Sequence, residues 1–354
     1  MSDEKNMSGK KQPAGHTLLK RIILGLYIVA VALSLVVVVS FVALKLYAPP
    51  PEVSGQVEFP LTTDSLPNQS GNVPDASDAP DATGTPDVVG TDNPEKVILN
   101  RRKGVYTCLL LGVADQGGSD SIMLGVFDTE GRTASLTSIP RDTAVSYENR
   151  IIKISAAYSY GGVDAVVQCV RELLAVPIDY YVRVNFRAFQ KIVDEIGGVW
   201  FDVPPGMDYD DPYQNLHIHL APGYQKLYGE DALKLVRCRS AYASQDIGRS
   251  ATQRAFLVAL VKQTITLSNV TKVTELIKIL NTYVKSDMPL NDMVYFGTEA
   301  IGMDLDTALT SSILSTNWVS PYIVPREAEV LKLVNSLGIY EEEVPAEVLK
   351  LVNP

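Results

Sequence analysis

The longest apolar run in the chain lies near its N-terminus. Residues 22–44 contain no charged side chain. As a helix rising ~1.5 Å per residue, this run would extend over about 35 Å, enough to cross the hydrocarbon core of a bilayer. Because the apolar core of a signal peptide spans only about 7–15 residues, the run predicts an uncleaved transmembrane helix.

Charges on either side of this run predict its orientation. Residues 1–21 carry five basic and two acidic side chains, whereas residues 48–95 carry nine acidic and no basic ones. Basic flanks favour the cytoplasmic side. We therefore expect residues 1–21 to form a cytoplasmic tail, and the chain beyond this single membrane pass to be extracellular. Residues 45–95 are rich in Pro, Asp, Ser, Thr and Gly, a composition that predicts a disordered acidic linker.

The remaining chain alternates between strand-like and helix-like patterns. Short apolar or alternating runs predict strands at residues 105–112, 121–127, 132–139, 180–184 and 199–203, and amphipathic runs predict helices at 163–174, 188–196, 231–236 and 250–267. Strands that alternate with helices indicate an α/β fold with helices on the faces of a sheet. We expect this domain to cover residues 96–285. Helical patterns at 292–301 and 327–337 predict a C-terminal helical extension over residues 286–354.

The net charge and the cysteines add two constraints. The formal charge is −10, but nine acidic side chains lie in the linker, so the charge does not exclude an anionic ligand for the domain. The three cysteines, Cys108, Cys169 and Cys238, are widely spaced and odd in number. This arrangement predicts unpaired thiols, with neither a disulfide framework nor a cysteine metal site.

Several common enzyme motifs are absent from the sequence. It contains no G-x-x-x-x-G-K-[ST] loop, no G-x-S-x-G elbow and no H-E-x-x-H pair. His217 and His219 share one face of a strand, where they could ligate a metal. We favour an ordinary polar strand face, because the sequence offers no third ligand at metal spacing.

Arginines and carboxylates near the ends of the predicted elements suggest a different chemistry. Arg237 and Arg239 stand two apart after a short helix, a spacing that in extended chain points both side chains to the same side. Asp246, Arg249 and Gln253 follow at offsets of three and four, so they share one stripe of a helix that starts near Asp246.

Two further charged positions adjoin the predicted strands. Arg141 follows the stretch SLTSIP, and Asp120 precedes the stretch SIMLGVF. Arginine forks match phosphate oxygens two at a time, and carboxylates are ligands that Mg²⁺ prefers. The set therefore suits a phosphate-bearing ligand with a divalent cation. The alternative is local surface ion pairs, Asp246 with Arg249 and Arg141 with Asp142, which are common and weak.

Six ordered stretches lie between about residues 105 and 260. They read LLLGVADQGGSDSIMLGVF, SLTSIPRDT, KISAAYSYGG, IDYYVRVNFRAFQKIVDEIGGVWFDVP, APGYQKLYGEDALKLVRCRS and DIGRSATQR. In content, order and spacing this set resembles the LytR-CpsA-Psr family. Its members also have a short cytoplasmic tail, one membrane helix and an extracellular catalytic domain. The resemblance implies an α/β/α sandwich around a mixed sheet, with an apolar cleft for a lipid chain.

The resemblance also implies an activity. Family members are phosphotransferases of bacterial cell-wall assembly, which move a glycopolymer with one phosphate from a polyprenyl-pyrophosphate carrier to a sugar hydroxyl of peptidoglycan, usually with Mg²⁺. The expected partners are therefore the lipid-linked glycan, peptidoglycan and the membrane, and not nucleic acid. The polymer stays open among wall teichoic acid, capsule and other glycans.

Motif by motif, the resemblance assigns roles to particular residues. It implies Asp120, Asp246 and Gln253 as catalytic residues, with Asp120 linked to the metal, and it implies pyrophosphate binding by Arg141, Arg237, Arg239 and Arg249. The chain departs from the family at Ala114, where members usually carry an aspartate, and at Gly118, where many carry an arginine. Asp115, one residue after Ala114, is the candidate to replace the missing metal ligand.

Phosphoryl transfer depends mainly on positioning and on neutralising charge. Either Asp246 or Asp120 could accept the proton of the attacking hydroxyl. A polyprenyl substrate would need an apolar groove near the arginines, and we expect the 163–174 and 250–267 helices to line it. Two other functions stay open: a non-catalytic binder of lipid-linked glycan or wall polymer, and a pyrophosphate hydrolase.

Overall fold

The computed structural model describes residues 48–61, 96–114, 117–212, 216–242, 246–265, 278, 281–301 and 303–354. The predicted membrane helix at 22–44 lies outside these ranges. Within them, no helix combines the length and the apolar character that crossing a bilayer requires.

A six-stranded mixed sheet forms the centre of the domain. Its order is β13 (Lys285–Ser286), β8 (Tyr180–Asn185), β3 (Val105–Val113), β4 (Ser119–Asp128), β5 (Thr133–Ile139) and β14 (Leu309–Ile313). The β3–β8 and β5–β14 pairs are parallel, and the other neighbours are antiparallel. The prediction of an α/β fold around a mixed sheet is therefore confirmed.

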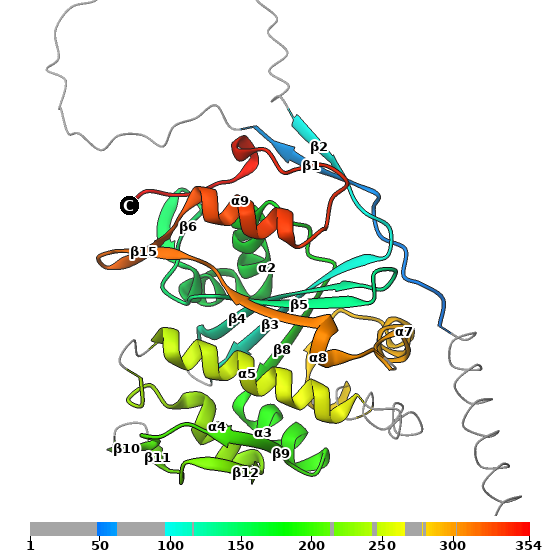
Figure 1. The fold of residues 1–354 in the computed structure, drawn as a ribbon. Helices are drawn as coiled ribbons and strands as arrows, with labels where there is room; N and C mark the ends of the chain where they lie inside the picture. Colours follow the sequence, from blue (N-terminus) through cyan, green and yellow to red (C-terminus); the bar gives the residue numbers. More distant parts are fainter. Residues whose placement is uncertain are drawn as a thin grey trace, which may run out of the picture.

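One face of the sheet packs on α2 (Ile154–Leu174) and α9 (Glu327–Ser336), which lie above it in Figure 1. Alternate residues of β3, such as Leu109 and Leu111, face this main core and are fully buried. Helix α2 starts earlier than the pattern predicts. A break at Gly161–Gly162 divides it, and its second half coincides with the predicted 163–174 helix.

The other face of the sheet is covered by α5 (Asp246–Thr264) and α7 (Leu290–Ala300) (Figure 1). Phe256 of α5 is buried in a second, smaller core, where its ring lies 5.8 Å from Phe189 and 5.5 Å from Phe201. This core is built from α3 (Phe186–Glu195), α4 (Gly229–Arg237), β9 (Val199–Val203), β12 (Gly223–Leu227) and β11 (Leu216–His219), together with Met207 just before β10 (Asp208–Asp211). Helices thus cover both faces of the sheet.

Part of the predicted linker is ordered, which corrects the expectation of disorder over 45–95. Strand β1 (Gln56–Pro60) pairs antiparallel with β2 (Lys96–Asn100), and Val57 and Phe59 are buried in the main core. The segment is polar on average, but these two alternating apolar residues bury enough surface to hold a strand against the core. Residues 62–95 lie outside the described ranges.

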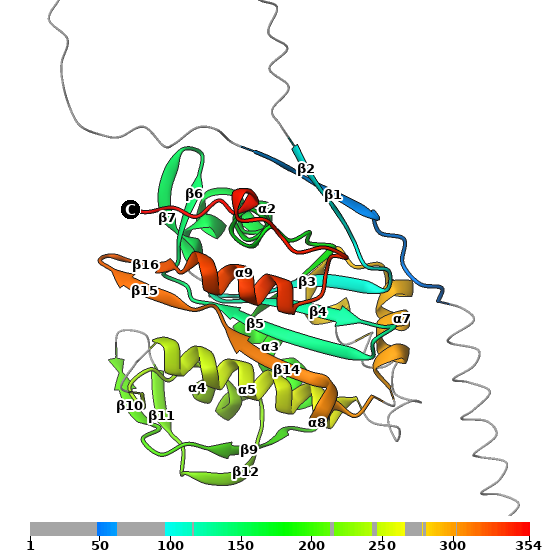
Figure 2. The same cartoon turned by 45° about the horizontal axis from the view of Figure 1, so that its top comes forward.

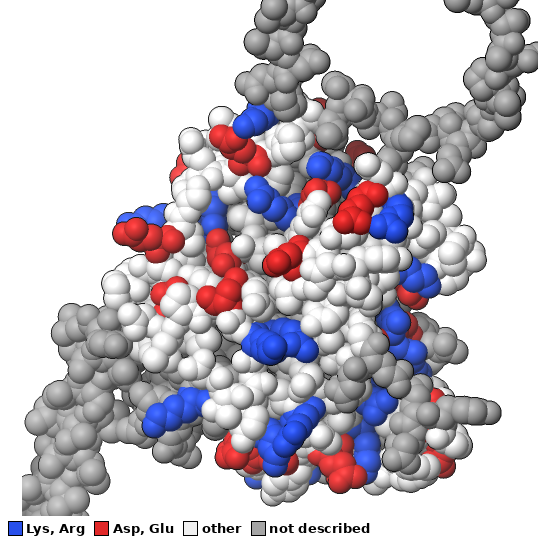
Figure 3. All heavy atoms as spheres, turned by 180° about the vertical axis from the view of Figure 1, so that it is seen from behind, with Lys and Arg blue, Asp and Glu red and all other residues white. Residues whose placement is uncertain are grey.

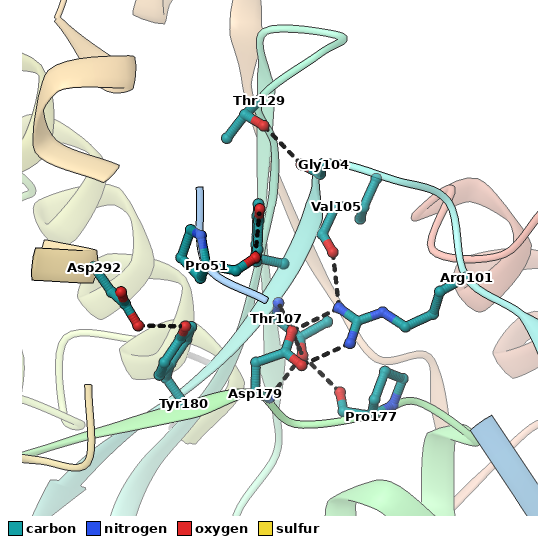
Figure 4. Close-up of polar contacts among 11 residues, drawn as sticks. Pro51, Arg101, Gly104, Val105, Thr107, Thr129, Pro177, Asp179, Tyr180 and Asp292 are labelled. Carbon is teal, nitrogen blue, oxygen red and sulfur yellow. Dashed lines mark hydrogen bonds and ion pairs between the residues drawn. The ribbon is translucent and has the colours of Figure 1, made fainter. Parts of the chain in front are cut away.

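A buried ion pair fixes the chain after β2 (Figure 4). Both terminal nitrogens of Arg101 lie 2.6 Å from the carboxylate oxygens of Asp179, and the two side chains are only 3% and 9% exposed. Asp179 also accepts a hydrogen bond from the Thr107 amide at 2.8 Å. The contact thereby joins the segment after β2 to the beginnings of β3 and β8.

The C-terminal segment is not purely helical, which corrects the expectation of a helical extension over 286–354. Besides α7, α8 (Leu305–Ala308) and α9 it contains β14, the hairpin β15 (Thr316–Val319) and β16 (Tyr322–Pro325), and the 3₁₀ turn Ala346–Val348. Strand β14 extends the central sheet along β5 (Figure 2). A bridge from Thr143 to Ile323 also links β16 to the segment before β6 (Ala144–Tyr147) and β7 (Arg150–Lys153).

The prediction of unpaired thiols is confirmed: Cys108, Cys169 and Cys238 are all free. Burial is the main cause that raises the pKa of both Cys108 and Cys169 to about 12, so these thiols stay protonated at neutral pH. On the face seen from behind in Figure 3, acidic and basic side chains are interspersed. The excess of negative charge belongs mainly to residues 48–95.

Candidate active site

Five of the charged residues singled out in the sequence meet at one edge of the sheet. Arg141 forms a short ion pair with Oδ1 of Asp120, and the same oxygen lies 4.0 Å from Nη2 of Arg239. Oδ1 of Asp246 lies 3.6 Å from Nε of Arg239 and 2.6 Å from Nη2 of Arg249. Residues as far apart as Asp120 and Arg249 therefore share one cluster, which we call the arginine–aspartate cluster.

The pairing of β4 with β5 explains how the first two residues meet. Ile122 of β4 lies opposite Ile139 of β5, so the start of β4 lies beside the end of β5. Asp120 is the second residue of β4, and Arg141 follows β5 by two positions. The antiparallel register alone thus brings their side chains together at one edge.

A close approach between α5 and the preceding segment places the other three charges. Tyr242 packs on the first turn of α5 at Gly248, where a Cβ would come within 2.4 Å of the tyrosine. Its hydroxyl also shares a short hydrogen bond with Thr252. Only glycine permits this contact, and it holds the segment with Arg239 against the helix that carries Asp246 and Arg249.

Arg249 is the most deeply placed charge of the cluster, with a side chain only 4% exposed. Burial lowers its pKa to about 10, and the positive charges of Arg239 and Arg141 act in the same direction, while Asp246 and Asp120 oppose the shift. The guanidinium stays charged at neutral pH. Three arginines against two aspartates leave the cluster with a net charge of +1, which favours an anion.

The alternative of local ion pairs is only partly supported. Asp246 and Arg249 do pair within one helix turn, but both also belong to the larger cluster. Arg141 lies 4.0 Å from Asp142 through its Nε, whereas Asp142 pairs with Lys153 at 3.1 Å. Lys153, which the sequence analysis did not single out, adds a basic group beside the cluster.

Arg237 does not follow the same-side expectation. It is still part of α4, with Cys238 as the extended cap residue, so the two-residue alternation does not apply between Arg237 and Arg239. Its guanidinium lies over the Phe186 ring, 4.8 Å from the ring centre. Phe186 directly follows the end of β8, so Arg237 approaches the same edge of the sheet by another route.

Of the other two predicted site residues, Gln253 lies within the described part of the chain and Asp115 does not. Gln253 donates a hydrogen bond to the carbonyl of Val236 at 2.9 Å, a contact that positions α4 relative to α5. Asp115 lies outside the described residues. Arg254 was not singled out, although it stands next to Gln253 in a quoted motif. It donates to Ser138 at 3.2 Å, and burial lowers its pKa.

An apolar cavity of about 350 Å³ lies on the same side of the sheet as the cluster. It is lined by Cys108, Leu110, Gly125, Phe127, Leu136, Leu257, Val261 and Phe296, among others. Gly125 and Cys108 leave room that larger side chains would fill. The expected groove therefore has a counterpart under α5, but the expectation for 163–174 was wrong, because α2 packs on the opposite face.

Three elements connect the cluster to the cavity. Helix α5 carries Arg249 and, eight residues later, Leu257, about 12 Å along its axis. Strand β4 carries Asp120 as its second residue and lines the cavity at Gly125, while β5 lines the cavity at Leu136 and ends two residues before Arg141. The site is thus charged at one end and apolar at the other.

The donor set also fits a magnesium ion chemically. Asp120 and Asp246 offer hard carboxylate oxygens, although Oδ1 of each already contacts arginines. Next to Asp120, the buried hydroxyl of Ser119 lacks a hydrogen-bond partner among the described residues. A further oxygen ligand or a water at the start of β4 would satisfy it.

The fold and this site define a class of protein: an α/β domain in which a positively charged site for an anion lies beside an apolar cavity. Comparison with known proteins gives the family. The model of the LytR_cpsA_psr family matches residues 79–336, well over half of the chain, and the chain belongs to this family.

Similar proteins and solved structures support this family assignment. The "polyisoprenyl-teichoic acid–peptidoglycan teichoic acid transferase TagV" of Bacillus subtilis (strain 168) is 32% identical over 213 residues, covering 56% of this chain and 54% of that protein. The crystal structure of B. subtilis TagV superposes with a TM-score of 0.59 at 28% identity, covering 67% of this chain and 96% of that one. A structure described as TagT bound to LI-WTA gives 0.54 at 26% identity, covering 66% and 90%. The chain thus spans about half the length of the curated TagV relative.

Proposed function

We propose that this protein is a phosphotransferase that moves a glycopolymer from a polyprenyl-pyrophosphate carrier to peptidoglycan. The main support is that one charged cluster and one apolar cavity lie along the same three elements, β4, β5 and α5. A polyprenyl-pyrophosphate has the same division into a doubly phosphorylated head and an apolar tail. The transferase name of TagV and the teichoic acid ligand of TagT support a teichoic-acid-like polymer.

The proposed reaction exchanges one phosphoester bond for another. A sugar hydroxyl of peptidoglycan attacks the phosphorus nearer the glycan, the bond from that phosphorus to the bridging oxygen breaks, and polyprenyl phosphate leaves. Arg141, Arg239 and Arg249 bind the pyrophosphate oxygens and neutralise the charge that builds on the bridging oxygen. Arg237 reaches the head group from α4, and Gln253 keeps α4 in place.

One carboxylate must accept the proton of the attacking hydroxyl. Asp120 and Asp246 both lie within the cluster, and both stay candidates for this general base. Mg²⁺, when bound, would neutralise negative charge on the pyrophosphate and so favour attack at phosphorus. Asp120 is the proposed ligand, with Asp115 as the second. Arg141 then orients the Asp120 carboxylate through their short ion pair.

The proposed location follows from the N-terminal pattern. Residues 22–44 anchor the chain in the cell membrane by a single helix with its N-terminus in the cytoplasm, and the catalytic domain works outside the cell. A lipid-linked donor would then reach the domain from the outer leaflet. The described chain begins at Ala48, which is buried against Tyr106 and Tyr295.

A transfer assay with the full chain in detergent tests this function. With labelled polyprenyl-pyrophosphate glycan, peptidoglycan and Mg²⁺, we expect transfer by the wild type and its loss in Arg239→Ala, together with weaker donor binding. Each charge-assisted hydrogen bond contributes ~1.5–3 kcal/mol, so donor affinity should fall roughly 10- to 150-fold. Arg150→Ala is the matched control, because Arg150 is exposed and pairs with Glu148.

The same assay tests the requirement for a metal ion and distinguishes the transferase from a binding module and from a hydrolase. Asp120→Ala should keep most of the donor binding but lose turnover and its Mg²⁺ dependence. If the wild type binds the donor without transferring it, the protein is a binding module. If it releases the glycan phosphate equally well without peptidoglycan, it is a pyrophosphate hydrolase.

A further inference from the structure

A second polar cluster lies on the hairpin of β10 and β11, away from the sheet edge that holds the arginines. In this antiparallel pair, Asp208 lies opposite His219 and Asp210 opposite His217. Successive strand residues point to opposite faces, so these four side chains share one face and form a two-by-two array of imidazoles and carboxylates.

The ligand atoms of this array are close together. Nδ1 of His217 lies 2.5 Å from Oδ1 of Asp210, and Nδ1 of His219 lies 2.6 Å from Oδ1 of Asp208. Nε2 of His219 also lies 3.4 Å from Oδ1 of Asp210. One ligand atom from each of Asp210, His217 and His219 fits within 4.8 Å of the others. The third ligand that the sequence spacing lacked comes from the opposite strand.

These distances match a small tetrahedral ion. Zinc bonds of ~2.0–2.1 Å in a tetrahedron place neighbouring ligand atoms about 3.3–3.4 Å apart. The pair from His219 Nε2 to Asp210 Oδ1 already has this separation. The pair from His217 to Asp210 is at hydrogen-bond distance and must open by only about 0.8 Å, which exposed side chains can do by a small rotation.

The opposite face of the hairpin makes the backbone of this array rigid. Ile218, between the two histidines, is fully buried in the second core, and Met207, just before β10, is 1% exposed. Leu220 donates its amide to the carbonyl of Met207 at 2.9 Å, which closes the open end of the hairpin. A rigid backbone with exposed ligand side chains is a favourable arrangement for binding an ion from solvent.

We propose that Asp210, His217 and His219 form a surface binding site for a divalent transition-metal ion of the zinc class, and that Asp208 orients His219 through its Nδ1. Imidazole nitrogens suit zinc and its neighbours, whereas Mg²⁺ and Ca²⁺ prefer oxygen ligands alone. The site is distinct from the arginine–aspartate cluster and does not depend on the transferase function.

Binding at this hairpin would also affect the neighbouring segment. Gly206 packs on Ala241, so that a Cβ at Gly206 would lie 3.6 Å from the Cα of Ala241. Ala241 is two residues from Arg239. A metal ion that cross-links the two strands would therefore stiffen the support of one arginine of the cluster, and its clearest effect should be greater stability of the folded chain.

Titration calorimetry and cobalt absorption test the site with the full chain in detergent. We expect one Zn²⁺ per chain with micromolar or tighter affinity, an increase in melting temperature with Zn²⁺, and a Co²⁺ spectrum typical of tetrahedral coordination. The His217→Ala/His219→Ala variant should lose more than about 100-fold in Zn²⁺ affinity, since even outer-shell changes cost 10- to 100-fold.

Asp211→Asn is the matched control, because Asp211 belongs to the same hairpin but faces the other side. It should bind Zn²⁺ like the wild type. The His217→Gln/His219→Gln variant keeps polar side chains on the hairpin and guards against misfolding as the cause of a loss. Zn²⁺ binding that is unchanged in both double variants, or wild-type protein that binds no Zn²⁺ at 100-fold molar excess, would overturn the proposal.

Discussion

At the scale of single residues, the members of the arginine–aspartate cluster differ in what they do for the fold. Arg249 is buried and relies on Asp246, whereas the Arg239 side chain is 45% exposed and adds to the positive charge around Arg249. Residues that bind a ligand are often neutral or costly for stability. Substitutions at Asp246 and at Arg239 should therefore change the free energy of unfolding by different amounts.

Urea unfolding of paired variants measures this difference. Asp246→Ala leaves the buried Arg249 guanidinium without its 2.6 Å partner, and we expect a loss of about 2–3 kcal/mol in the free energy of unfolding. Arg239→Ala removes an exposed charge that repels Arg249, and should change the stability by less than about 0.5 kcal/mol. Equal losses in the two variants would contradict this description of the cluster.

At the scale of elements, the face of the sheet under α5 carries two small residues, Cys108 and Gly125, among larger ones. Leu109, Leu111 and Leu124 fill the main core, whereas Cys108 and Gly125 border the cavity on the other side. The small side chains at Cys108 and Gly125 thus contribute to the space of the cavity.

Gly125→Leu should block this cavity. A Cβ at Gly125 would lie at ordinary contact distance, 3.5 Å from its nearest neighbours, so Gly125→Ala is a tolerated control. The leucine would displace roughly three methylene groups of a lipid chain at ~0.8 kcal/mol each, or about 50-fold in affinity. Binding of a long-chain donor should fall while that of a short, soluble prenyl donor is kept. An equal effect on both donors would place the lipid elsewhere.

The elements also show how far the sequence could predict this structure. Strands β3, β4, β5 and β8 were located to within about two residues, because central strands buried by helices read as continuous apolar runs. Strand β10 and the hairpin β15–β16 were missed, since most residues of β10 and β15 are exposed. Strand β14, with the polar sequence LTSSI, joins the sheet only through tertiary pairing with β5.

The site residues also divide into those that the sequence could predict and those that depended on the tertiary structure. The motifs contained Asp120, Arg141, Arg239, Asp246 and Arg249, and charges at element ends suggested a shared ligand. The direction of Arg237 depended on where α4 ends, and the missing third ligand for His217 and His219 was supplied by strand pairing. Neither can be obtained from spacing along a single segment.

At the scale of the whole molecule, the predicted anchor and the domain should be separable. The domain has its own buried cores, and the described chain starts at Ala48. A chain without residues 1–47 should move from the membrane fraction to the soluble fraction, and should keep its circular dichroism spectrum and its transfer activity with detergent-dispersed donor. A truncated chain that stays with the membrane would contradict the single-helix anchor.

The β1–β2 pair determines how the molecule would respond to a mechanical load. Gln56, where β1 begins, lies opposite Asn100, where β2 ends, and Arg101 is held to the domain by Asp179. Once Ala48 is pulled away from its cluster, tension on the chain ahead of β1 would act on both strands at this same end. The ladder would then unzip one residue pair at a time, which resists far less than sliding the whole pair. This joint would therefore yield before the central sheet does under such a load.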